Sequence, residues 1–367
     1  SFKVVPVITA PVTNPSDYAA PTATEDVVWN QIFADLQEAE SKLPVSYDNV
    51  SGLDKSQKGR ATKGAAAGLL GKAYLYRKDY AKAATQFEKF FTGSLNGVYS
   101  LVPDYRDNFR DVNENNSESL FEIQFTEGVG TDINWCCDPV GSWKQVQAIS
   151  VTYGMEGAGF SDYLPTRWIY DEYKKEKTVD GKSDPRLLVT IASYEPADNS
   201  IQAYGKTWFN PQDKIYPRKY TNDGVGNGKP FEGAAESGIN YRVLRYADIL
   251  LMYAEVLNEL NKTADAYPYI QQVRSRAKLP NLATVRPNMT QAQMRDQIAH
   301  ERALEFAIEG QRINDIIRWG WLYDAAKLAE LKTHDPDFNT WTAGNEYLPI
   351  PQVELDVNKN LLPNPAN

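Results

Sequence analysis

Residues 61–91 have the sequence ATKGAAAGLLGKAYLYRKDYAKAATQFEKFF, which carries the spacing of two short helices packed side by side. The residues at helical intervals are Leu70, Gly71 and Tyr74 in the first half and Ala83, Phe87 and Phe90 in the second. Gly71 and Ala83 are small where the helices would cross, and Phe87 is large enough to fill the space beside that crossing. Asp79 lies just before the second half, so we expect it to cap that helix.

The offsets match the tetratricopeptide repeat, in which Leu-Gly, Tyr, Ala and Phe occupy fixed positions, although Ala67 replaces the usual early Trp. A second hairpin is expected within residues 241–280, where Ala254, Leu257, Ala266 and Ile270 repeat the alternation of small and large residues. Pro268 is expected in or near the first turn of its helix, because proline lacks a backbone donor. The fold class predicted is therefore mostly α, with tetratricopeptide-like hairpins forming an α/α superhelix.

Further helices and a few short strands are expected around these hairpins. Thr22 and Glu25 have capping-box spacing before a periodic apolar run, and Thr290 and Gln293 open another helix that we expect to continue to Gly310. Residues 101–109 and 118–125 have strand-like or irregular patterns.

Residues 128–238 are dominated by loops and contain many of the aromatic side chains. A long connection of this kind is usually functional or disordered, and its aromatic content argues against disorder. Flat rings beside amides and carboxylates suit a sugar, whose C–H face stacks on the ring. The expected stacking residues are Trp135, Trp143, Tyr153, Tyr204 and Trp208, and the expected polar contacts are Asp132, Asn134 and Asn210. The alternative is that these rings anchor the loops to the body.

Composition excludes several classes of function. The net charge is −9 and there is no long basic run, which argues against nucleic acid as a partner. No stretch reaches the length of apolar sequence that crosses a membrane. Cys136 and Cys137 are adjacent, which is neither a disulfide framework nor a metal motif, and whether they are bridged stays open. No cofactor is expected, although a structural calcium ion in an Asp/Asn-rich loop stays open.

No motif for catalysis is found. His300-Glu301 resembles the start of HExxH, but Leu304 stands where the second histidine would be. Glu301, Glu305 and Glu309 are spaced as a ladder of like charge on one helix, so cations must face them. We expect Arg312 and Arg318 to supply those cations, which makes the carboxylates structural and not a catalytic pair.

Several segments together resemble one family. They are ATKGAAAGLLGKAYLY (61–76), NNSESLFEIQF (115–125), SDPRL (183–187), YPRKY (216–220), RYADILLMYAEVLNEL (245–260), IQQVRSRAKLP (270–280), ERALEFAIEGQRINDIIRWG (301–320) and YLPIPQVELDVNKNLLPNP (347–365). In this order they are similar to the SusD/RagB family of surface nutrient-binding lipoproteins of Bacteroidetes.

The resemblance implies a non-enzymatic protein on the outer face of the outer membrane that captures an oligosaccharide and passes it to a SusC-like TonB-dependent transporter. It also implies a division into residues 1–92, the remaining part of an N-terminal repeat region, and 93–367, a region with ligand-binding loops at about 128–238, packed as one unit. A lipid anchor and further N-terminal helices are expected outside this chain, with part of the ligand site.

Three alternatives stay open. The chain could be a tetratricopeptide-type protein-interaction scaffold, a peptide-binding RagB-like protein, or an all-helical enzyme that cleaves glycans. The last requires a paired acid and base in a cleft.

Overall fold

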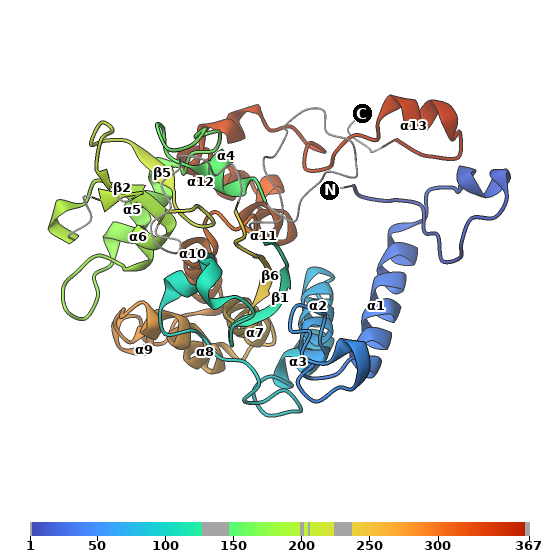
Figure 1. Cartoon of the computed structure of the whole chain (residues 1–367), viewed down its shortest axis with the longest axis horizontal. Coiled ribbons are helices and arrows are strands. Elements are labelled where there is room, and N and C mark those ends of the chain that lie inside the picture. Colours follow the sequence, from blue (N-terminus) through green and yellow to red (C-terminus); the bar gives the residue numbers. More distant parts are fainter. Residues whose placement is uncertain (1, 127–146, 199–201, 205, 224–236, 364–367) are drawn as a thin grey trace. The chain divides into compact units, whose positions relative to one another are not determined.

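A computed structural model describes residues 2–126, 147–198, 202–204, 206–223 and 237–363, and these form two compact units (Figure 1). The first unit joins Ser1–Lys42 to Ile313–Asn367, and the second spans Leu43–Arg312. The expected division into residues 1–92 and 93–367 follows from the resemblance to the family, and it stays a prediction.

The first unit contains the helices α1 (Glu25–Lys42), α12 (Ala325–His334) and α13 (Gln352–Val357), and α11 (Arg312–Trp319) enters it from the second unit. Ile316, Leu322 and Leu331 form its buried core, with Trp321 and Trp341 packed against them. Helix α1 is capped by Thr24, whose Oγ1 accepts from the Val27 amide at 3.4 Å. The expected capping box of Thr22 and Glu25 was therefore placed too early, because the helix begins at Glu25 itself.

The second unit contains the helices α2 (Lys63–Tyr76), α3 (Tyr80–Glu88), α4 (Ile149–Tyr153), α5 (Arg167–Lys175), α6 (Arg186–Thr190), α7 (Tyr246–Glu259), α8 (Thr263–Arg276), α9 (Leu282–Val285) and α10 (Gln291–Phe306). Its strands are β1 (Ser119–Ile123), β2 (Ile191–Ser193), β3 (Gln202–Ala203), β4 (Lys206–Thr207), β5 (Ile215–Pro217) and β6 (Tyr241–Arg245). The predicted class, mostly helical with few short strands, is confirmed.

The α2–α3 hairpin is confirmed in its details. Thr62 caps α2 and Asp79 caps α3, each through a side-chain oxygen that accepts a backbone N–H at 3.2 Å. A Cβ on Gly71 would lie 2.5 Å from the ring of Phe87, so only glycine permits this approach of the two helices. Phe87 is fully buried.

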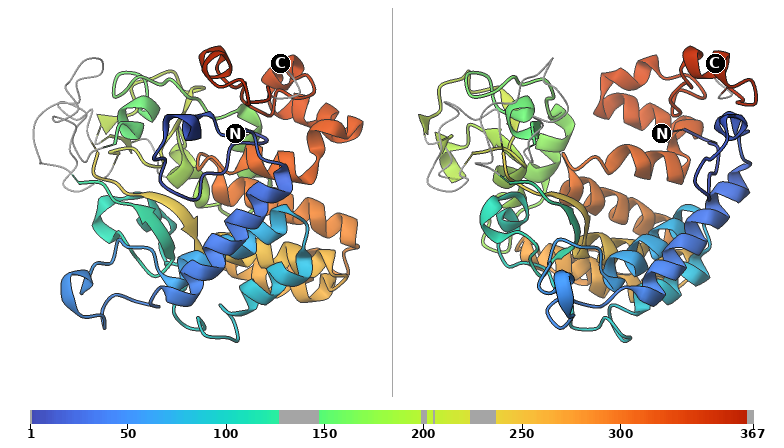
Figure 2. Two further views of the ribbon diagram at one scale, coloured as in Figure 1. Left: turned by 90° about the vertical axis from the view of Figure 1, so that its right-hand side faces the viewer. Right: turned by 45° about the vertical axis from the view of Figure 1, so that its right-hand side comes forward.

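Helix α7 is the centre of the unit, because every residue from Tyr246 to Asn258 is buried. It packs against α3, α8 and α10, and with α2 these helices form what we call the helical scaffold (Figures 1 and 2). Pro268 is the sixth residue of α8, so its expected place in or near the first turn was wrong. The helix tolerates this proline because Pro268 and Ala264, whose carbonyl loses its partner, are both exposed to water.

Strands β1 and β6 pair antiparallel, with Phe121 opposite Leu244 and Ile123 opposite Tyr241. Helix α2 covers this pair closely, since a Cβ on Gly68 would lie 2.8 Å from the Leu244 side chain. The other described pairs, β2–β5 and β3–β4, lie in the part of the chain between β1 and β6. We call the described residues 147–198, 202–204 and 206–223 the loop-rich region; it also contains the short helices α4, α5 and α6.

Candidate functional site

The chain segments that follow β1 and precede β6 are held together by polar contacts. We call these contacts, made by Glu122, Phe125, Gln147, Ser237 and Asn240, the polar stem. The Asn240 side chain accepts from the Phe125 amide at 2.7 Å and donates to Glu122 at 2.8 Å. Gln147 and Ser237 exchange two backbone hydrogen bonds of 3.0 and 3.1 Å. The chain therefore leaves the scaffold after β1 and returns to it before β6 at neighbouring points.

Glu114 belongs to the same stem, where its Oε1 accepts from the Asn240 amide at 2.7 Å. Burial raises the pKa of this carboxyl to about 7, and the hydrogen bond from Asn240 and the charge of Arg242 offset only part of the effect. The stem therefore contains a group that changes charge near neutral pH.

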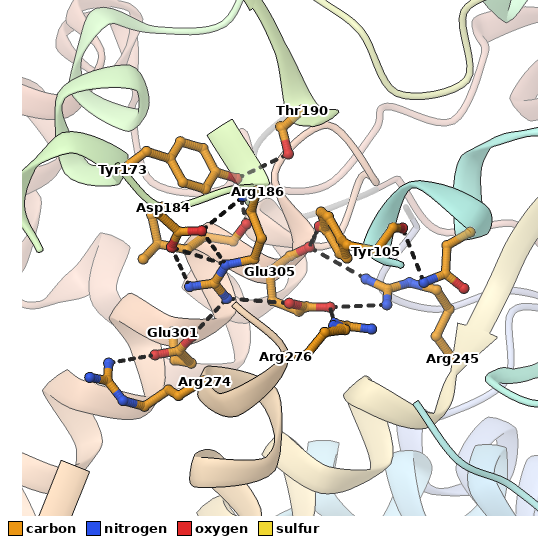
Figure 3. Close-up of polar contacts among 12 residues, drawn as sticks. Tyr105, Tyr173, Asp184, Arg186, Thr190, Arg245, Arg274, Arg276, Glu301 and Glu305 are labelled. Atoms are coloured by element: carbon orange, nitrogen blue, oxygen red, sulfur yellow. Dashed lines mark hydrogen bonds and ion pairs between the residues drawn. The ribbon is translucent and has the colours of Figure 1, made fainter. Parts of the chain in front are cut away.

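A buried charged cluster fastens the loop-rich region to α10 (Figure 3). The Arg186 guanidinium is fully buried and its Nη2 donates to Asp184 at 2.7 Å. Its Nη1 donates to Glu301 at 2.7 Å and to Glu305 at 3.3 Å. Because Asp184 and Arg186 lie in the loop-rich region, these bonds fix that region against the scaffold.

Glu305 lies at the centre of the cluster and meets cations from three directions. Arg245 of β6 approaches it at 3.1 Å, Arg276 of α8 binds the same oxygen, and Arg186 binds the other. Burial alone would raise the pKa of the Glu305 carboxyl, but Arg276, Arg245, Arg186 and Lys219 together lower it to about 2. Glu305 is therefore ionised at neutral pH, and its charge balances the cations around it.

The expected partners of this cluster were wrong. Helix α10 ends at Phe306 and not at Gly310, so Glu309 lies beyond the helix, where Arg245 reaches it at 2.9 Å. Arg318 pairs instead with Asp315, at 2.8 Å. The cations that compensate the glutamates are remote in sequence, which local spacing could not reveal. The prediction was wrong because it considered cations on the neighbouring helix alone.

The same contacts account for His300 and Glu301. His300 Nε2 lies 3.1 Å from Glu172, while Glu301 binds Arg186 and Arg274. Within the residues that the structure describes, no group of three or more His, Cys, Asp and Glu side chains is placed to hold a metal ion.

Exposed and half-buried rings lie around the turn formed by residues 154–159 in the loop-rich region. Tyr153 ends α4, and its ring packs edge to face with Tyr163 at 5.8 Å. Phe160 and Tyr163 are 55% and 63% exposed. The Phe160 amide donates to Val151 at 2.8 Å, and two further backbone bonds hold the next two residues. These rings are therefore presented by a well-anchored segment.

A second segment borders the same turn. Phe209 is 45% exposed, and its ring lies against Gly157, where an added Cβ would be 2.9 Å away. The Asn210 side chain donates to the Glu156 carbonyl at 3.0 Å. We call Tyr153, Phe160, Tyr163, Phe209 and Asn210 the aromatic surface. It includes two of the predicted site residues, Tyr153 and Asn210.

Trp208 and Tyr204 lie beneath this segment. Trp208 is partly buried, its ring lies 6.3 Å from Tyr216, and its Nε1 donates to Pro211 at 3.4 Å. Tyr204 is buried and packs with Met155, and burial raises its pKa to about 12. The ring of Tyr204 is therefore covered in this structure, and its role as a stacking residue stays a prediction, as does that of Trp208.

The other four predicted site residues, Asp132, Asn134, Trp135 and Trp143, lie outside the described residues and stay predictions. The sequence analysis did not select Phe160 and Tyr163. The only signal for them was the placement of large rings among Gly, Ser, Asp and Pro, where a chain has little core to fill.

In the described residues, no helix is both long and apolar enough to cross a membrane. Among solved structures, the chain is similar to a SusD superfamily protein from Bacteroides vulgatus, with a TM-score of 0.79 and 30% identity over 100% of this chain and 74% of that one. A laminarin-binding SusD-like protein gives a TM-score of 0.71 and 28% identity, with the same coverage.

Among curated proteins, SusD-like protein P2 of Formosa agariphila is 28% identical over 99% of this chain and 69% of its own length. SusD-like protein P25 of the same organism is 27% identical over 93% of this chain and 64% of its own length. The profile of the SusD family matches residues 117–366, which is more than half of the chain. Because the family match covers most of the chain and a SusD superfamily structure shares its fold, the chain belongs to the SusD family.

Proposed function

We propose that this protein captures a glycan at the cell surface without altering it chemically and delivers it to a SusC-like TonB-dependent outer-membrane transporter. The attachment to the outer membrane, through a lipid anchor, is part of the proposal, and no cofactor or metal takes part. The observation that carries the proposal is the aromatic surface of a chain that belongs to the SusD family.

The aromatic surface has the chemistry that sugar binding needs. Phe160 and Tyr163 keep more than half of their surface in water, although burial of such rings is favourable. A pyranose can cover an exposed ring with its C–H face while amide and carboxylate groups nearby bind its hydroxyls. Similarity to a laminarin-binding SusD-like protein supports a polysaccharide as the ligand class.

The test is retention in native gels that contain a soluble polysaccharide, beginning with laminarin. We expect Tyr163→Ala and Phe160→Ala each to weaken retention about tenfold, because exposed aromatic anchors commonly contribute more than about 1 kcal/mol to binding. Tyr18→Ala is the matched control, since Tyr18 is 73% exposed and lies in the other unit. Retention that is equal in all three variants and the unchanged chain would refute the role of the aromatic surface.

Trp135→Ala and Trp143→Ala extend the same test to the remaining stacking candidates, and we expect weaker retention with an unchanged melting temperature. A peptide array run in parallel distinguishes the scaffold and peptide-binding alternatives, which predict binding to peptides and none to glycans. A reducing-sugar assay on the retained polysaccharide distinguishes the enzyme alternative, which predicts the release of new chain ends.

A further inference from the structure

Two asparagines in the described part of the chain precede a glycine or a serine, Asn96-Gly97 and Asn116-Ser117. A small following residue lets its own backbone nitrogen approach the asparagine side chain, because no bulky Cβ substituent blocks the way. The sequence therefore marks both asparagines as chemically reactive. The structure distinguishes them, since it holds one pair by hydrogen bonds and leaves the other open to solvent.

Asn96 and Gly97 are the two central residues of a turn, which the Val98 amide closes by donating to the Leu95 carbonyl at 3.2 Å. Gly97 has a φ of +76°, a left-handed conformation that favours glycine at the third position of a turn. Both central residues are exposed. No described atom beyond the chain neighbours of Gly97 lies within 4 Å of the place that a Cβ would take there. The peptide unit between the two residues therefore lies in open solvent.

The reacting groups of this turn are free to meet. Within the residues that the structure describes, neither the Asn96 side-chain amide nor the Gly97 backbone N–H makes a hydrogen bond. The start of the turn is anchored, because the buried Leu95 donates its amide to the Lys89 carbonyl at 2.9 Å. The central peptide unit can therefore rotate without breaking a contact and bring the Gly97 nitrogen to the Asn96 side chain.

The side chain of Asn116 is held at both ends of its amide. Its Nδ2 donates to the Asn113 carbonyl at 2.9 Å, and its Oδ1 accepts from the Glu118 backbone amide at 2.9 Å. The hydroxyl of the next residue, Ser117, donates to the Ser100 carbonyl at 3.3 Å. Attack on the Asn116 side chain requires these bonds to break first, and each of them stabilises the unreactive conformation.

We propose that Asn96 is a site of spontaneous deamidation, at which the folded protein converts this residue to aspartate and isoaspartate while Asn116 stays intact. The Gly97 nitrogen loses its proton and bonds to Cγ of Asn96. The Cγ–Nδ2 bond breaks, and its nitrogen takes up that proton and leaves as ammonia, which closes a five-membered succinimide ring. Water then opens the ring at either carbonyl. One water is consumed and one ammonia is released, with no change of oxidation state.

The reaction changes the wall of a hollow. Asn96 lines an open hollow of about 730 Å³ between residues 96–103 and α8. Among its described lining residues Arg276 alone is charged, and Glu118 and Glu305 already bind that guanidinium. Deamidation adds a carboxylate to this wall and makes the chain one unit more negative than −9. Isoaspartate also lengthens the backbone of the turn by one carbon.

The experiment is incubation of the folded chain at pH 8 in water labelled with heavy oxygen, followed by tryptic digestion and mass spectrometry. Asn96 lies in the peptide 90–106 and Asn116 in the peptide 111–144, so the two sites are measured separately. We expect the peptide 90–106 to gain one labelled oxygen and to separate into an aspartate and an isoaspartate form. Direct hydrolysis of the side chain gives aspartate alone, so isoaspartate identifies the ring.

Ser117→Gly is the matched variant, because both asparagines then precede glycine and their hydrogen bonding still differs. We expect Asn96 to react at least about tenfold faster than Asn116 in this folded variant, since the held side chain must first lose its bonds. Unfolding in urea should accelerate the reaction at Asn116 about tenfold and change the rate at Asn96 much less.

Asn96→Gln tests the ring itself, because the longer side chain cannot close a five-membered ring, and the labelled product should disappear from the peptide 90–106. Three results would each overturn the proposal. They are an unmodified Asn96 after incubation of the folded chain, equal rates at the two asparagines of folded Ser117→Gly, and reaction at Asn96 in urea alone.

Discussion

The helical scaffold and the loop-rich region both contain many aromatic side chains, but they place them differently. In the scaffold the rings face one another: Phe91 stacks on Tyr253 at 5.0 Å and meets Tyr269 at 4.7 Å. In the loop-rich region Phe160 and Tyr163 face solvent. Rings of the same residue types are therefore buried in one place and exposed in another, and only the surroundings of each ring separate the two cases.

Apolar and charged contacts both occur in each region. In the scaffold, Gly71 lies against Phe87 and Arg276 of α8 binds Glu305 of α10. The loop-rich region meets α10 through the ion pairs of Arg186 and through an apolar cluster that includes Leu187 and Leu304. Breaking each kind of contact in turn tests how much it contributes to stability.

The largest effect is expected from Glu305→Ala. It leaves Arg186, Arg245 and Arg276 short of a buried partner, and losing one member of a buried ionic cluster typically costs about 3–5 kcal/mol. Urea unfolding should therefore show a much lower midpoint. Glu38→Ala, which removes an exposed ion pair with Lys42, is the control and should leave the midpoint unchanged. Equal midpoints for both variants would show that the cluster does not stabilise the fold.

The contribution of Glu305 to stability depends on pH with a defined sign, which Glu305→Gln tests. The folded-state pKa of Glu305 is about 2, below the ordinary value of 4.5, so its stabilising contribution is present above pH 4.5. That contribution is lost as the pH falls toward 2. The difference in stability between the unchanged chain and Glu305→Gln should narrow over this interval.

Phe87→Ala and Phe160→Ala compare a buried ring with an exposed one. Removing the fully buried Phe87 should cost about 3–5 kcal/mol of unfolding free energy. Removing Phe160 should change it by less than about 1 kcal/mol, because much of that ring already lies in water. Glycan retention should respond in the opposite order. A large loss of stability in Phe160→Ala would remove the distinction between the two sets of rings.

The smallest effect is expected at the stem, from Glu114→Gln. The folded-state pKa of Glu114 is about 7, above the ordinary value of 4.5, so folding favours its protonated form. Stability contributed by this group is complete below pH 4.5 and is lost as the pH rises to 7. Glu114→Gln should therefore melt at a higher temperature than the unchanged chain at pH 8 and at the same temperature at pH 4.

Glu354→Gln, a substitution at an exposed carboxyl, is the control for that measurement. It should melt at the same temperature as the unchanged chain at pH 4 and at pH 8. A Glu114→Gln variant that melts lower than the unchanged chain at pH 8 would contradict the direction of the pKa shift.

The scaffold could be predicted because its contacts are local. The positions of Gly71, Asp79 and Phe87 follow from helical spacing within one short segment, and the structure confirms them. The resemblance of several sequence segments to the SusD/RagB family also predicted the family of the protein. Helix α5 also had a local signal, with Ile169, Tyr170 and Tyr173 buried on one face, but the surrounding glycines and prolines obscured it.

The site could be predicted only in part, because exposure depends on residues that are far apart in the sequence. Arg186 and Glu301 are 115 positions apart, and no periodicity links them. Tyr204 and Tyr163 look alike in the sequence, yet one is buried against Met155 and the other is open to solvent. Telling a buried ring from an exposed one therefore required the tertiary structure.

The polar stem has a consequence for how this protein can be diversified. Since Phe125 and Asn240 are bonded to each other, the chain between them can be replaced as a cassette whose two ends already coincide. Lengthening such an insertion is inexpensive, because each doubling of a flexible loop adds only about 0.6 kcal/mol of closure entropy. A cassette carrying a different ligand specificity has to keep Asp184 and Arg186, whose carboxylate and guanidinium complete the charged cluster of α10. Recombination among relatives at these borders would exchange the loop-rich region while leaving the helical hairpins intact.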